Sequence, residues 1–335
     1  MKQTNTNADV GIVVIGRNEG SRIALSLQSM QAGLWPIIYV DSGSSDHSVN
    51  VAKPLVDAVI ELDTLSPFSA ARARNEGFAK LKSLFPKVEY VQFVDGDCVL
   101  SAGWMETARQ AMIDDAMRAS VIGHLQELNA DKTMYNKLCA LEWKSPAGDL
   151  SNFGALGGIS MMRANVFEKL GGFNAQVIAG EDSEFGVRLS LSGYKVTKID
   201  HDMATHDANM TTFGQWWRRS VRAGHAIGQR AYINGQTQAK DCMKERKSTI
   251  VWGLMIPAII LLFLWPTRGL SLFLLGLYIV LGWRIFKYRR QLGDKTKDAL
   301  LYMRFVILAK FANGIGLLKF YFNRFKKRYE IIEYK

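Results

Sequence analysis

The sequence predicts an α/β protein with a mixed, mainly parallel sheet flanked by helices, followed by apolar helices that associate with a membrane. Three observations carry this prediction. Short apolar runs alternate with helically spaced segments, polar and acidic residues directly follow several of those runs, and two long apolar stretches lie close together near the C-terminus. Strand–helix alternation at this spacing is typical of layered parallel sheets. The 335 residues suffice for one large domain with an appendage.

The alternating segments begin near the N-terminus. Residues 10–15 form a continuous apolar run, as expected of a strand buried on both faces. Further strands are predicted at 36–40, 58–62, 88–94, 121–128, 159–163 and 194–199. Apolar residues at helical spacing predict helices at 21–30, 70–84, 104–117, 164–170 and 183–192.

Apolar residues and charge are unevenly distributed toward the C-terminus. Residues 249–265 and 269–283 are nearly all apolar, and basic residues on their outer flanks contribute much of the formal charge of +11. Such flanks favour an anionic membrane surface over nucleic acid. Both stretches are short beside the roughly 20 residues of a spanning helix. A hairpin that crosses and returns is expected, with a re-entrant or interfacial placement as the alternative.

The chain is therefore expected to divide into an α/β domain, residues 1–235, and a membrane-associated helical region, residues 236–335. A third apolar segment, 299–322, is interrupted by polar residues and is expected to be an interfacial or partner-packed helix. Basic flanks predict that both ends of the hairpin lie in the cytoplasm. The polar first nine residues lack the core of a signal peptide, which predicts an α/β domain facing the cytoplasm at the inner membrane.

Two carboxylates directly follow the strand predicted at 88–94. Asp95 and Asp97 are separated by one glycine, at the sheet edge where open α/β sheets bind ligands. Hard oxygen ligands suit Mg²⁺ or Mn²⁺, which usually share their coordination with substrate phosphates. The alternative is an Asp-Gly turn with two solvated acids. The cysteines, Cys98, Cys139 and Cys242, show no paired spacing that predicts a disulfide framework or a zinc site.

These segments in this order resemble the family 2 glycosyltransferases, which have the GT-A fold. The resemblance covers roughly residues 10–230, and Gly16 stands where proline is usual in that family. The matching motifs are Arg17-Asn18-Glu19, Asp41-Ser42-Gly43-Ser44-Ser45-Asp46, Ala73-Arg74-Asn75-Glu76-Gly77, Asp95-Gly96-Asp97, Gly171-Gly172-Phe173, Gly180-Glu181-Asp182 and Arg188 with Gly193-Tyr194. Each motif alone is weak, but their order is specific.

The resemblance implies a site for the sugar donor, a nucleotide-diphosphate sugar. Asp95 and Asp97 would hold Mg²⁺ or Mn²⁺ against the diphosphate, with Asp95 also facing the ribose. His206 is the candidate third metal ligand, although a lone histidine is more often structural or solvated. The nucleotide-binding candidates are Glu19, Asp41, Arg74 and Asn75, with Arg72 as an alternative on another face of the same helix.

The acceptor needs a carboxylate that takes the proton of the attacking hydroxyl. The resemblance assigns this role to Asp182, and its neighbour Glu181 is the alternative; both acids also suit the first turn of a helix. Arg218 and Arg222 are four residues apart, and arginine forks suit phosphate oxygens. Trp217 beside them could stack on a sugar or anchor at a membrane interface. A solvated basic face on an amphipathic connector is the alternative for this segment.

The sequence thus predicts a metal-dependent inverting glycosyltransferase, a nucleotide-sugar-dependent hexosyltransferase of polysaccharide biosynthesis. Its acceptor would be a lipid-linked or cell-envelope glycan. The alternatives are a sugar nucleotidylyltransferase, which can share a similar layered fold, and a catalytically inactive membrane scaffold. A nucleotidylyltransferase needs a glycine-rich phosphate loop after the first strand, and residues 16–20 match such a loop poorly.

Overall fold

The computed structural model describes residues 8–63, 65, 68–150 and 156–327. The chain forms two compact units, unit 1 with Met1–Asn129 and Glu142–Ala208, and unit 2 with Ala130–Leu141 and Asn209–Lys335. Helix α8 (Phe213–Asn234) therefore belongs to unit 2. The functional division expected near residue 235 stays a prediction.

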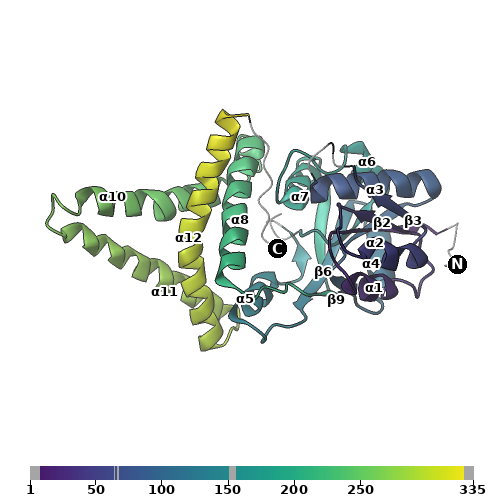
Figure 1. Cartoon of the computed structure of the whole chain (residues 1–335), viewed down its shortest axis with the longest axis horizontal. Coiled ribbons are helices and arrows are strands. Elements are labelled where there is room, and N and C mark those ends of the chain that lie inside the picture. Colours follow the sequence, from purple (N-terminus) through teal and green to yellow (C-terminus); the bar gives the residue numbers. More distant parts are fainter. Residues whose placement is uncertain (1–7, 64, 66–67, 151–155, 328–335) are drawn as a thin grey trace. The chain divides into compact units, whose positions relative to one another are not determined.

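Unit 1 is built on a nine-stranded sheet (Figure 1). The strands are β1 (Val10–Gly16), β2 (Ile37–Asp41), β3 (Ala58–Glu61), β4 (Tyr90–Asp95), β5 (Cys98–Leu100), β6 (Arg118–Glu127), β7 (Gly148–Asp149), β8 (Ser160–Arg163) and β9 (Lys195–His206). Their order is β3-β2-β1-β4-β8-β6-β9-β5, and β7 pairs with β9. The expected mixed sheet flanked by helices is confirmed.

The first four strands in this order are parallel and deliver acidic residues to one edge. Strand β1 pairs with β2 and with β4, so that Gly16 lies opposite Asp41 and Ile15 lies opposite Asp95. Residues 10–14 of β1 are fully buried, in agreement with the apolar run in the sequence. The carboxyl ends of these strands therefore meet at one edge, where such sheets bind ligands.

The rest of the sheet contains two features that the sequence did not predict. Strand β5 has three residues, and β9 continues to His206, beyond the predicted end at 199. The two strands pair antiparallel, with Cys98 opposite His206. The apolar run of β5 is too short to stand out as a strand, and residues 200–202 are polar and lack the apolar pattern of one. This pairing nevertheless positions part of the candidate site.

Helices cover both faces of this sheet. They are α1 (Arg22–Gln28), α2 (Ser48–Ala52), α3 (Ala70–Leu84), α4 (Trp104–Asp114), α6 (Ala164–Lys169) and α7 (Glu181–Leu191). Figure 1 shows α3 and α6 on one side of the sheet and α1 and α4 on the other. In the core, the ring of Phe173 lies 5.3 Å from that of Phe93 in β4 and 5.3 Å from that of Phe185 in α7. This aromatic packing fixes α7 against the sheet.

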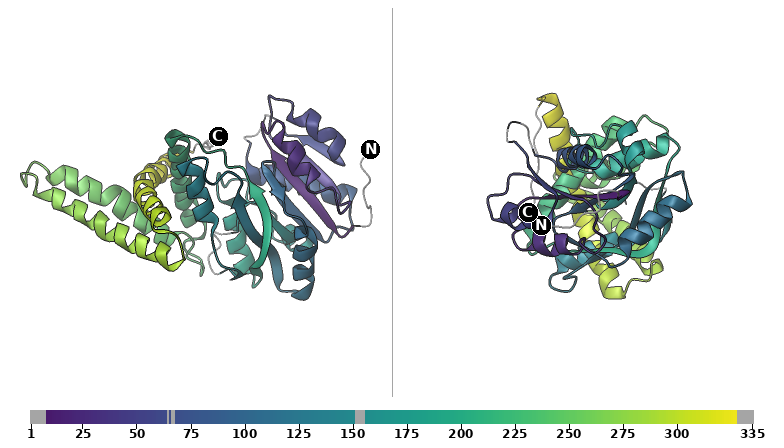
Figure 2. Two further views of the ribbon diagram at one scale, coloured as in Figure 1. Left: turned by 90° about the horizontal axis from the view of Figure 1, so that it is seen from below. Right: turned by 90° about the vertical axis from the view of Figure 1, so that its right-hand side faces the viewer.

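Unit 2 is helical. Besides α8 it contains most of α5 (Met134–Trp143) and the segments α9 (Met243–Thr249), η3 (Ile250–Met255), α10 (Ile256–Phe263), η4 (Leu270–Leu275), α11 (Gly276–Gln291) and α12 (Thr296–Phe325). Helices α8 and α12 run side by side (Figure 2). Glycines permit the close approach, because a Cβ atom at Gly316 would lie 1.9 Å from the carbonyl oxygen of Val221.

Three helical segments of unit 2 are long and apolar enough to cross a membrane, namely Met243–Phe263, Leu270–Gln291 and Thr296–Phe325. The first two contain the predicted hairpin, with the turn at residues 264–269. The third contains the segment expected as interfacial or partner-packed. Some of its polar residues face other helices, since Lys310 Nζ donates to Ser248 Oγ at 3.0 Å. These helices indicate membrane association; whether each spans stays a prediction.

Candidate active site

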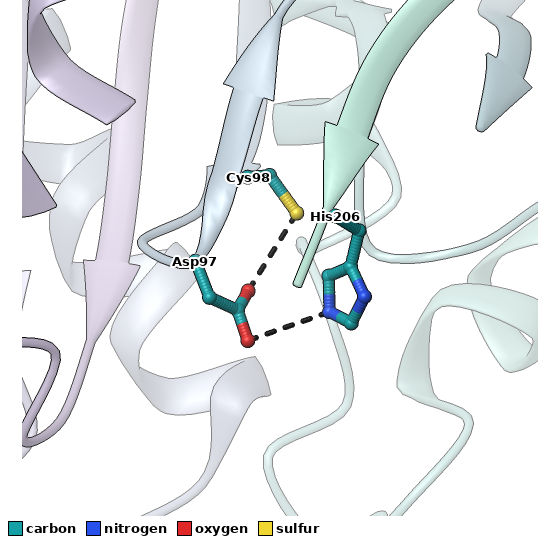
Figure 3. A group of neighbouring side chains, drawn as sticks. All are labelled: Asp97, Cys98 and His206. Atoms are coloured by element: carbon teal, nitrogen blue, oxygen red, sulfur yellow. Dashed lines mark hydrogen bonds and ion pairs between the residues drawn. The ribbon is translucent and has the colours of Figure 1, made fainter. Parts of the chain in front are cut away.

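Asp97, Cys98 and His206 form a group of potential metal ligands at the β5–β9 pairing (Figure 3). The Nε2 atom of His206 lies 3.4 Å from Oδ2 of Asp97. The Cys98 thiol donates to Oδ1 of Asp97 at 3.6 Å. One ligand atom from each residue lies within 4.8 Å of the others, and Asp97 is only 6% exposed. The structure thus brings together the two predicted ligands Asp97 and His206.

The imidazole of His206 is held from two further sides. Its Nδ1 atom lies 3.8 Å from Oε2 of Glu127, which stands opposite His206 in the β6–β9 ladder. The ring of Trp143 contacts it edge-on, with 4.9 Å between ring centroids. Carboxylates behind a ligating histidine fix the orientation of its ring. One carboxylate and one imidazole fit Mn²⁺ better than Mg²⁺, which prefers oxygen ligands.

Asp95 lies outside this group and pairs instead with Arg74 of α3. Arg74 Nη2 donates to Oδ1 of Asp95 at 2.7 Å, and Arg74 Nη1 donates to Oε1 of Glu181 at 2.5 Å. The arginine is buried, and burial lowers its pKa, but the surrounding carboxylates of Asp95, Glu181 and Asp182 leave the Arg74 pKa raised. One guanidinium therefore joins the end of β4 to the start of α7.

Two positions near Arg74 explain how the pairing fits. A Cβ atom at Gly158 would lie 2.2 Å from Arg74 Nη2, so a side chain here would displace the guanidinium from its present position. Gly180, the residue before α7, has φ of 78°, a left-handed conformation that favours glycine. Glycine at both positions lets the chain pass over the ion pair and begin the helix with its acids beside Arg74.

The two candidate bases differ in their surroundings. Glu181 is 6% exposed and accepts from Arg74, whereas Asp182 is half-buried. Oδ1 of Asp182 accepts the backbone N–H of Ser183 at 2.6 Å, which orients the carboxylate at the first turn of α7. The geometry favours Asp182 for proton transfer, because Glu181 is committed to a buried ion pair.

Asp41 lies at the end of β2 and is buried. Its carboxylate accepts from Tyr39 Oη at 3.0 Å, from the Ser44 backbone N–H at 2.7 Å and from Ser44 Oγ at 2.5 Å. Burial, followed by the charge of Asp41, raises the pKa of Tyr39, so the phenol stays protonated and donates. Gly16 lies beside these groups, because a Cβ atom there would lie 3.1 Å from Tyr39 Oη. The structure thus holds the Asp41 carboxylate in one orientation.

Glu19 and Arg72, two further nucleotide-binding candidates, form ion pairs with separate sets of residues. Glu19 is buried and forms an ion pair of 2.9 Å with Arg22. Arg72 pairs with Asp63 and Glu76, each at 2.7 Å, and these contacts are separate from those of Arg74.

Both polar atoms of the Asn75 side-chain amide form hydrogen bonds with the backbone of Phe173. Its Nδ2 donates to the carbonyl oxygen of Phe173 at 2.7 Å, and Oδ1 accepts the Phe173 N–H at 2.9 Å. Gly172 has φ of 67°, and a Cβ atom there would lie 2.6 Å from Asn75 Oδ1. These contacts anchor the Gly171-Gly172-Phe173 turn to α3.

Trp217, Arg218 and Arg222 lie on α8 in unit 2, and the helix places Arg218 and Arg222 one turn apart. Arg218 is exposed, while Trp217 and Arg222 are half-buried. The ring of Trp217 packs 5.7 Å from that of Phe213. Their role in substrate binding stays a prediction.

Sequence reasoning missed several groups at the site. Cys98 could have been noticed, since it directly follows Asp97 in the chain. Glu127 and Trp143 carry no local signal, because only the β6–β9 pairing and the packing of Trp143 place them at His206. The sequence likewise gives no reason to single out Gly158, whose importance follows from its closeness to the Arg74 guanidinium.

Sequence comparisons identify the class of protein. Residues 11–171 match glycosyl transferase family 2, and residues 140–212 match the model described as N-terminal domain of galactosyltransferase. Glycosyltransferase AglE of Haloferax volcanii is 22% identical over 233 residues, covering 66% of this chain and 73% of that protein. O-antigen chain rhamnosyltransferase WbaN of Salmonella anatum is 23% identical over 188 residues, covering 52% of this chain and 57% of that protein.

Solved structures show the same fold. Mannosyltransferase PcManGT from Pyrobaculum calidifontis, in complex with GDP-Man and Mn²⁺, has a TM-score of 0.56 at 16% identity, covering 92% of this chain and 87% of that one. S. aureus TarS 1-349 in complex with UDP has a TM-score of 0.50 at 15% identity, covering 98% of this chain and 95% of that one. Together with the family match, these likenesses establish a GT-A fold and support sugar transfer.

Proposed function

The chain is a family 2 glycosyltransferase, and from this premise we propose that it is a metal-dependent, inverting enzyme with a membrane-bound acceptor. It moves a sugar from a nucleotide-diphosphate donor to a lipid-linked or cell-envelope glycan at the cytoplasmic face of the inner membrane. The observation that carries the proposal is the Arg74 bridge, 2.7 Å to Asp95 and 2.5 Å to Glu181. It joins the end of β4 to the start of α7, which supports one site for the donor and the candidate base.

Asp97 and His206 are the residues we assign to a divalent ion, Mn²⁺ or Mg²⁺, and Asp95 is a further candidate. Their oxygen and nitrogen atoms suit such an ion. PcManGT is in complex with Mn²⁺, which supports the assignment by analogy. When bound, the ion supplies positive charge to the departing diphosphate. Asp97 is buried, so its charge is poorly screened by solvent and favours cation binding.

The donor side is assigned to residues at the ends of β1 and β2. Asp41, oriented by Tyr39 and Ser44, would accept hydrogen bonds from the base or the ribose of the nucleotide. Glu19 lines the same edge of the sheet. GDP-Man in PcManGT and UDP in TarS are the nucleotide ligands of structures with this fold. We assign Arg74 and Asn75 to holding the site together, because their polar groups bind other parts of the chain.

On the acceptor side, Asp182 takes the proton of the attacking hydroxyl. The hydroxyl oxygen forms the new bond to the anomeric carbon, the bond from that carbon to the diphosphate oxygen breaks, and the bonding electrons leave with the diphosphate. Attack from the side opposite the leaving group inverts the anomeric configuration. Arg74 holds Glu181, the neighbour of Asp182, and thereby positions the start of α7 for this step.

The acceptor and its location are argued from unit 2. Three candidate spans suit an enzyme whose acceptor is anchored in a membrane. WbaN is described as an O-antigen chain rhamnosyltransferase, which is compatible with this assignment. We further assign Trp217, Arg218 and Arg222 to the substrate, because arginine forks bind phosphate oxygens.

The test is a thermal-shift panel of nucleotide sugars with Mn²⁺ or Mg²⁺, followed by assay of donor turnover with the stabilising nucleotide. The wild-type protein should be stabilised by one nucleotide sugar only when the ion is present. Asp97→Ala should abolish both the shift and turnover, whereas the exposed Asp200→Ala should change neither. Full turnover by Asp97→Ala would overturn the metal role.

A further inference from the structure

An apolar groove runs between α11 and α12 within unit 2. Its volume is about 540 Å³. The lining residues include Tyr278, Gly282, Trp283 and Phe286 from α11 and Met303 and Ile307 from α12. Trp283 is 64% exposed although its ring is large and apolar. Both walls belong to helices long and apolar enough to cross a membrane.

The groove has a packed floor. A Cβ atom at Gly282 would lie 3.2 Å from Ile307 Cδ1 and 3.2 Å from Met303 Sδ, so the glycine brings the two helices together at the base. Behind it, the ring of Tyr278 stacks on Phe311 with 5.7 Å between centroids. The groove therefore lies between two contacting helices and has a defined floor, which a single exposed helix face would lack.

One end of the groove leads into positive charge. Lys287 and Arg290 follow the lining residues Trp283 and Phe286 by four positions on α11, and Lys297 precedes the lining residue Leu300 by three positions on α12. Residues three or four apart share a helix face, so each wall continues into a cation one turn beyond the groove. All three cations are exposed.

Two acids lie near this end of the groove. Asp294 is buried and paired with Arg289, and Asp298, in the first turn of α12, is half-buried, so the three exposed cations outnumber the acids there. An apolar groove that ends in several cations complements an amphiphile with a long apolar chain and a phosphate at one end. A neutral lipid could occupy the groove but would leave the cations without an anionic partner. A free phosphate could bind the cations but would leave the groove unoccupied by the same molecule.

We propose that this groove binds the apolar chain of the lipid-linked acceptor, with its phosphate at Lys287, Arg290 and Lys297. The inference rests on the proposed function, which it deepens by naming the acceptor as a phosphate-linked long-chain lipid. A hydrocarbon chain that already lies in lipid gains little apolar burial by entering the groove. Selectivity must therefore come from the groove shape and the cations together.

The experiment uses the full chain in phosphatidylcholine nanodiscs and a photoreactive long-chain isoprenyl phosphate, with crosslinked peptides identified by mass spectrometry. Label should concentrate on α11 and α12, and unlabelled long-chain isoprenyl phosphate should compete for it. Phosphatidylglycerol and a short-chain isoprenyl phosphate should compete poorly. Equal competition by phosphatidylglycerol would assign the groove to ordinary anionic lipid and overturn the proposal.

Variants separate the groove from the rest of the helices. Met303→Trp fills the groove and should lower labelling of α11 and α12 to the level given by the surrounding lipid, because the shape that selects the long chain is lost. Leu277→Trp, on the opposite face of α11 by helical spacing, should leave labelling unchanged. Changing Lys287, Arg290 and Lys297 to glutamine should also lower it. Gly282→Leu provides a second filling variant if Met303→Trp does not fold, and unchanged labelling in a folded filling variant overturns the proposal.

Donor binding by the wild-type protein keeps this test distinct from that of the proposed function. Nucleotide-dependent stabilisation with Mn²⁺ but uniform labelling would reject the groove alone. Specific groove labelling without any nucleotide-sugar binding or turnover would reject the proposed function, and would leave a lipid-binding groove in place.

Discussion

The Nε2 atom of His206 lies 3.4 Å from Oδ2 of Asp97, and the short antiparallel pairing of β5 with β9 brings the two residues together. The family resemblance implied that the two residues share a metal site, and the strand pairing supplies the geometry. Because β9 extends to His206 at its last residue, the histidine is fixed by the sheet and not by a loop. A ligand held on a strand keeps its geometry without added ordering cost.

This arrangement predicts that His206→Ala weakens Mn²⁺ binding by about tenfold or more, because changes around a metal site typically cost 10–100-fold in affinity. Calorimetric titration of Mn²⁺ in the presence of nucleotide measures the change. The exposed His47→Ala serves as the matched control and should bind as wild type. Unaltered affinity in His206→Ala would remove the histidine from the ligand set.

Chelation by EDTA should abolish donor turnover, and Mn²⁺ should restore it.

The bridge formed by Arg74 predicts a loss of stability when the guanidinium is removed. Arg74→Met leaves Asp95 and Glu181 without their shared partner, and breaking a buried ion pair costs about 3–5 kcal/mol. Arg74→Lys keeps the charge, but a single ammonium cannot reproduce the two-ended fork, so it should fall between wild type and Arg74→Met. Urea unfolding followed by circular dichroism gives the free energies.

A structural role for Arg74 also predicts how kinetics change in Arg74→Lys. Turnover should fall more than donor affinity, because the lysine misplaces the start of α7 while the proposed donor contact at Asp41 is unchanged. A variant with normal turnover and a donor affinity alone weakened would instead place Arg74 on the nucleotide. The matched control is Arg72→Lys, whose ion pairs with Asp63 and Glu76 are separate.

The different surroundings of Asp182 and Glu181 predict that substitutions at these two adjacent positions affect different properties of the protein. Asp182→Asn removes the proposed general base and should lower the rate of sugar transfer by about 10²–10⁴-fold while nucleotide binding persists. Glu181→Gln weakens the contact with Arg74 and should lower stability along with activity. Transfer kinetics and nucleotide-induced thermal shifts on the same preparations distinguish the two. If Glu181→Gln alone abolished transfer with normal stability, the roles would be exchanged.

The parts of the fold that the sequence predicted are those with a local signature. β1 is a buried apolar run, and α3 begins and ends as its apolar spacing predicted, with Ser69 accepting from the Arg72 N–H as its N-cap. β5 and the end of β9 were missed because they are short or polar and are ordered by pairing. The acids of the site were also predictable, since they follow strands or open a helix.

What the sequence could not predict is how the acids and bases combine. Asp95 and Asp97 are neighbours in one motif, yet one pairs with Arg74 and the other lies with His206. Residues two apart in one strand would share a face, but β4 ends at Asp95 and the chain turns before β5 begins at Cys98, and this turn separates the two carboxylates. The partners of Arg74 come from β4 and α7, and only the packing of α7 on the aromatic core brings Glu181 within reach.

Glycine packing between α8 and α12 gives the last prediction. A Cβ atom at Gly316 would lie 1.9 Å from the Val221 carbonyl oxygen and 2.8 Å from the His225 nitrogen, both backbone atoms that cannot rotate away. Gly316→Ala should therefore force the helices apart and destabilise unit 2 by about 1–3 kcal/mol, the usual cost of overpacking.

Gly276→Ala, at the start of α11 in the same unit, is the matched control. A Cβ atom there meets no atom within 4 Å, and alanine is the better helix former by roughly 1 kcal/mol. This variant should be neutral or slightly stabilising. Thermal unfolding of both variants in the same detergent measures the difference. If Gly316→Ala melted with or above Gly276→Ala, then α8 and α12 would not be in the close contact that the glycines permit, because no side-chain movement relieves a clash with backbone.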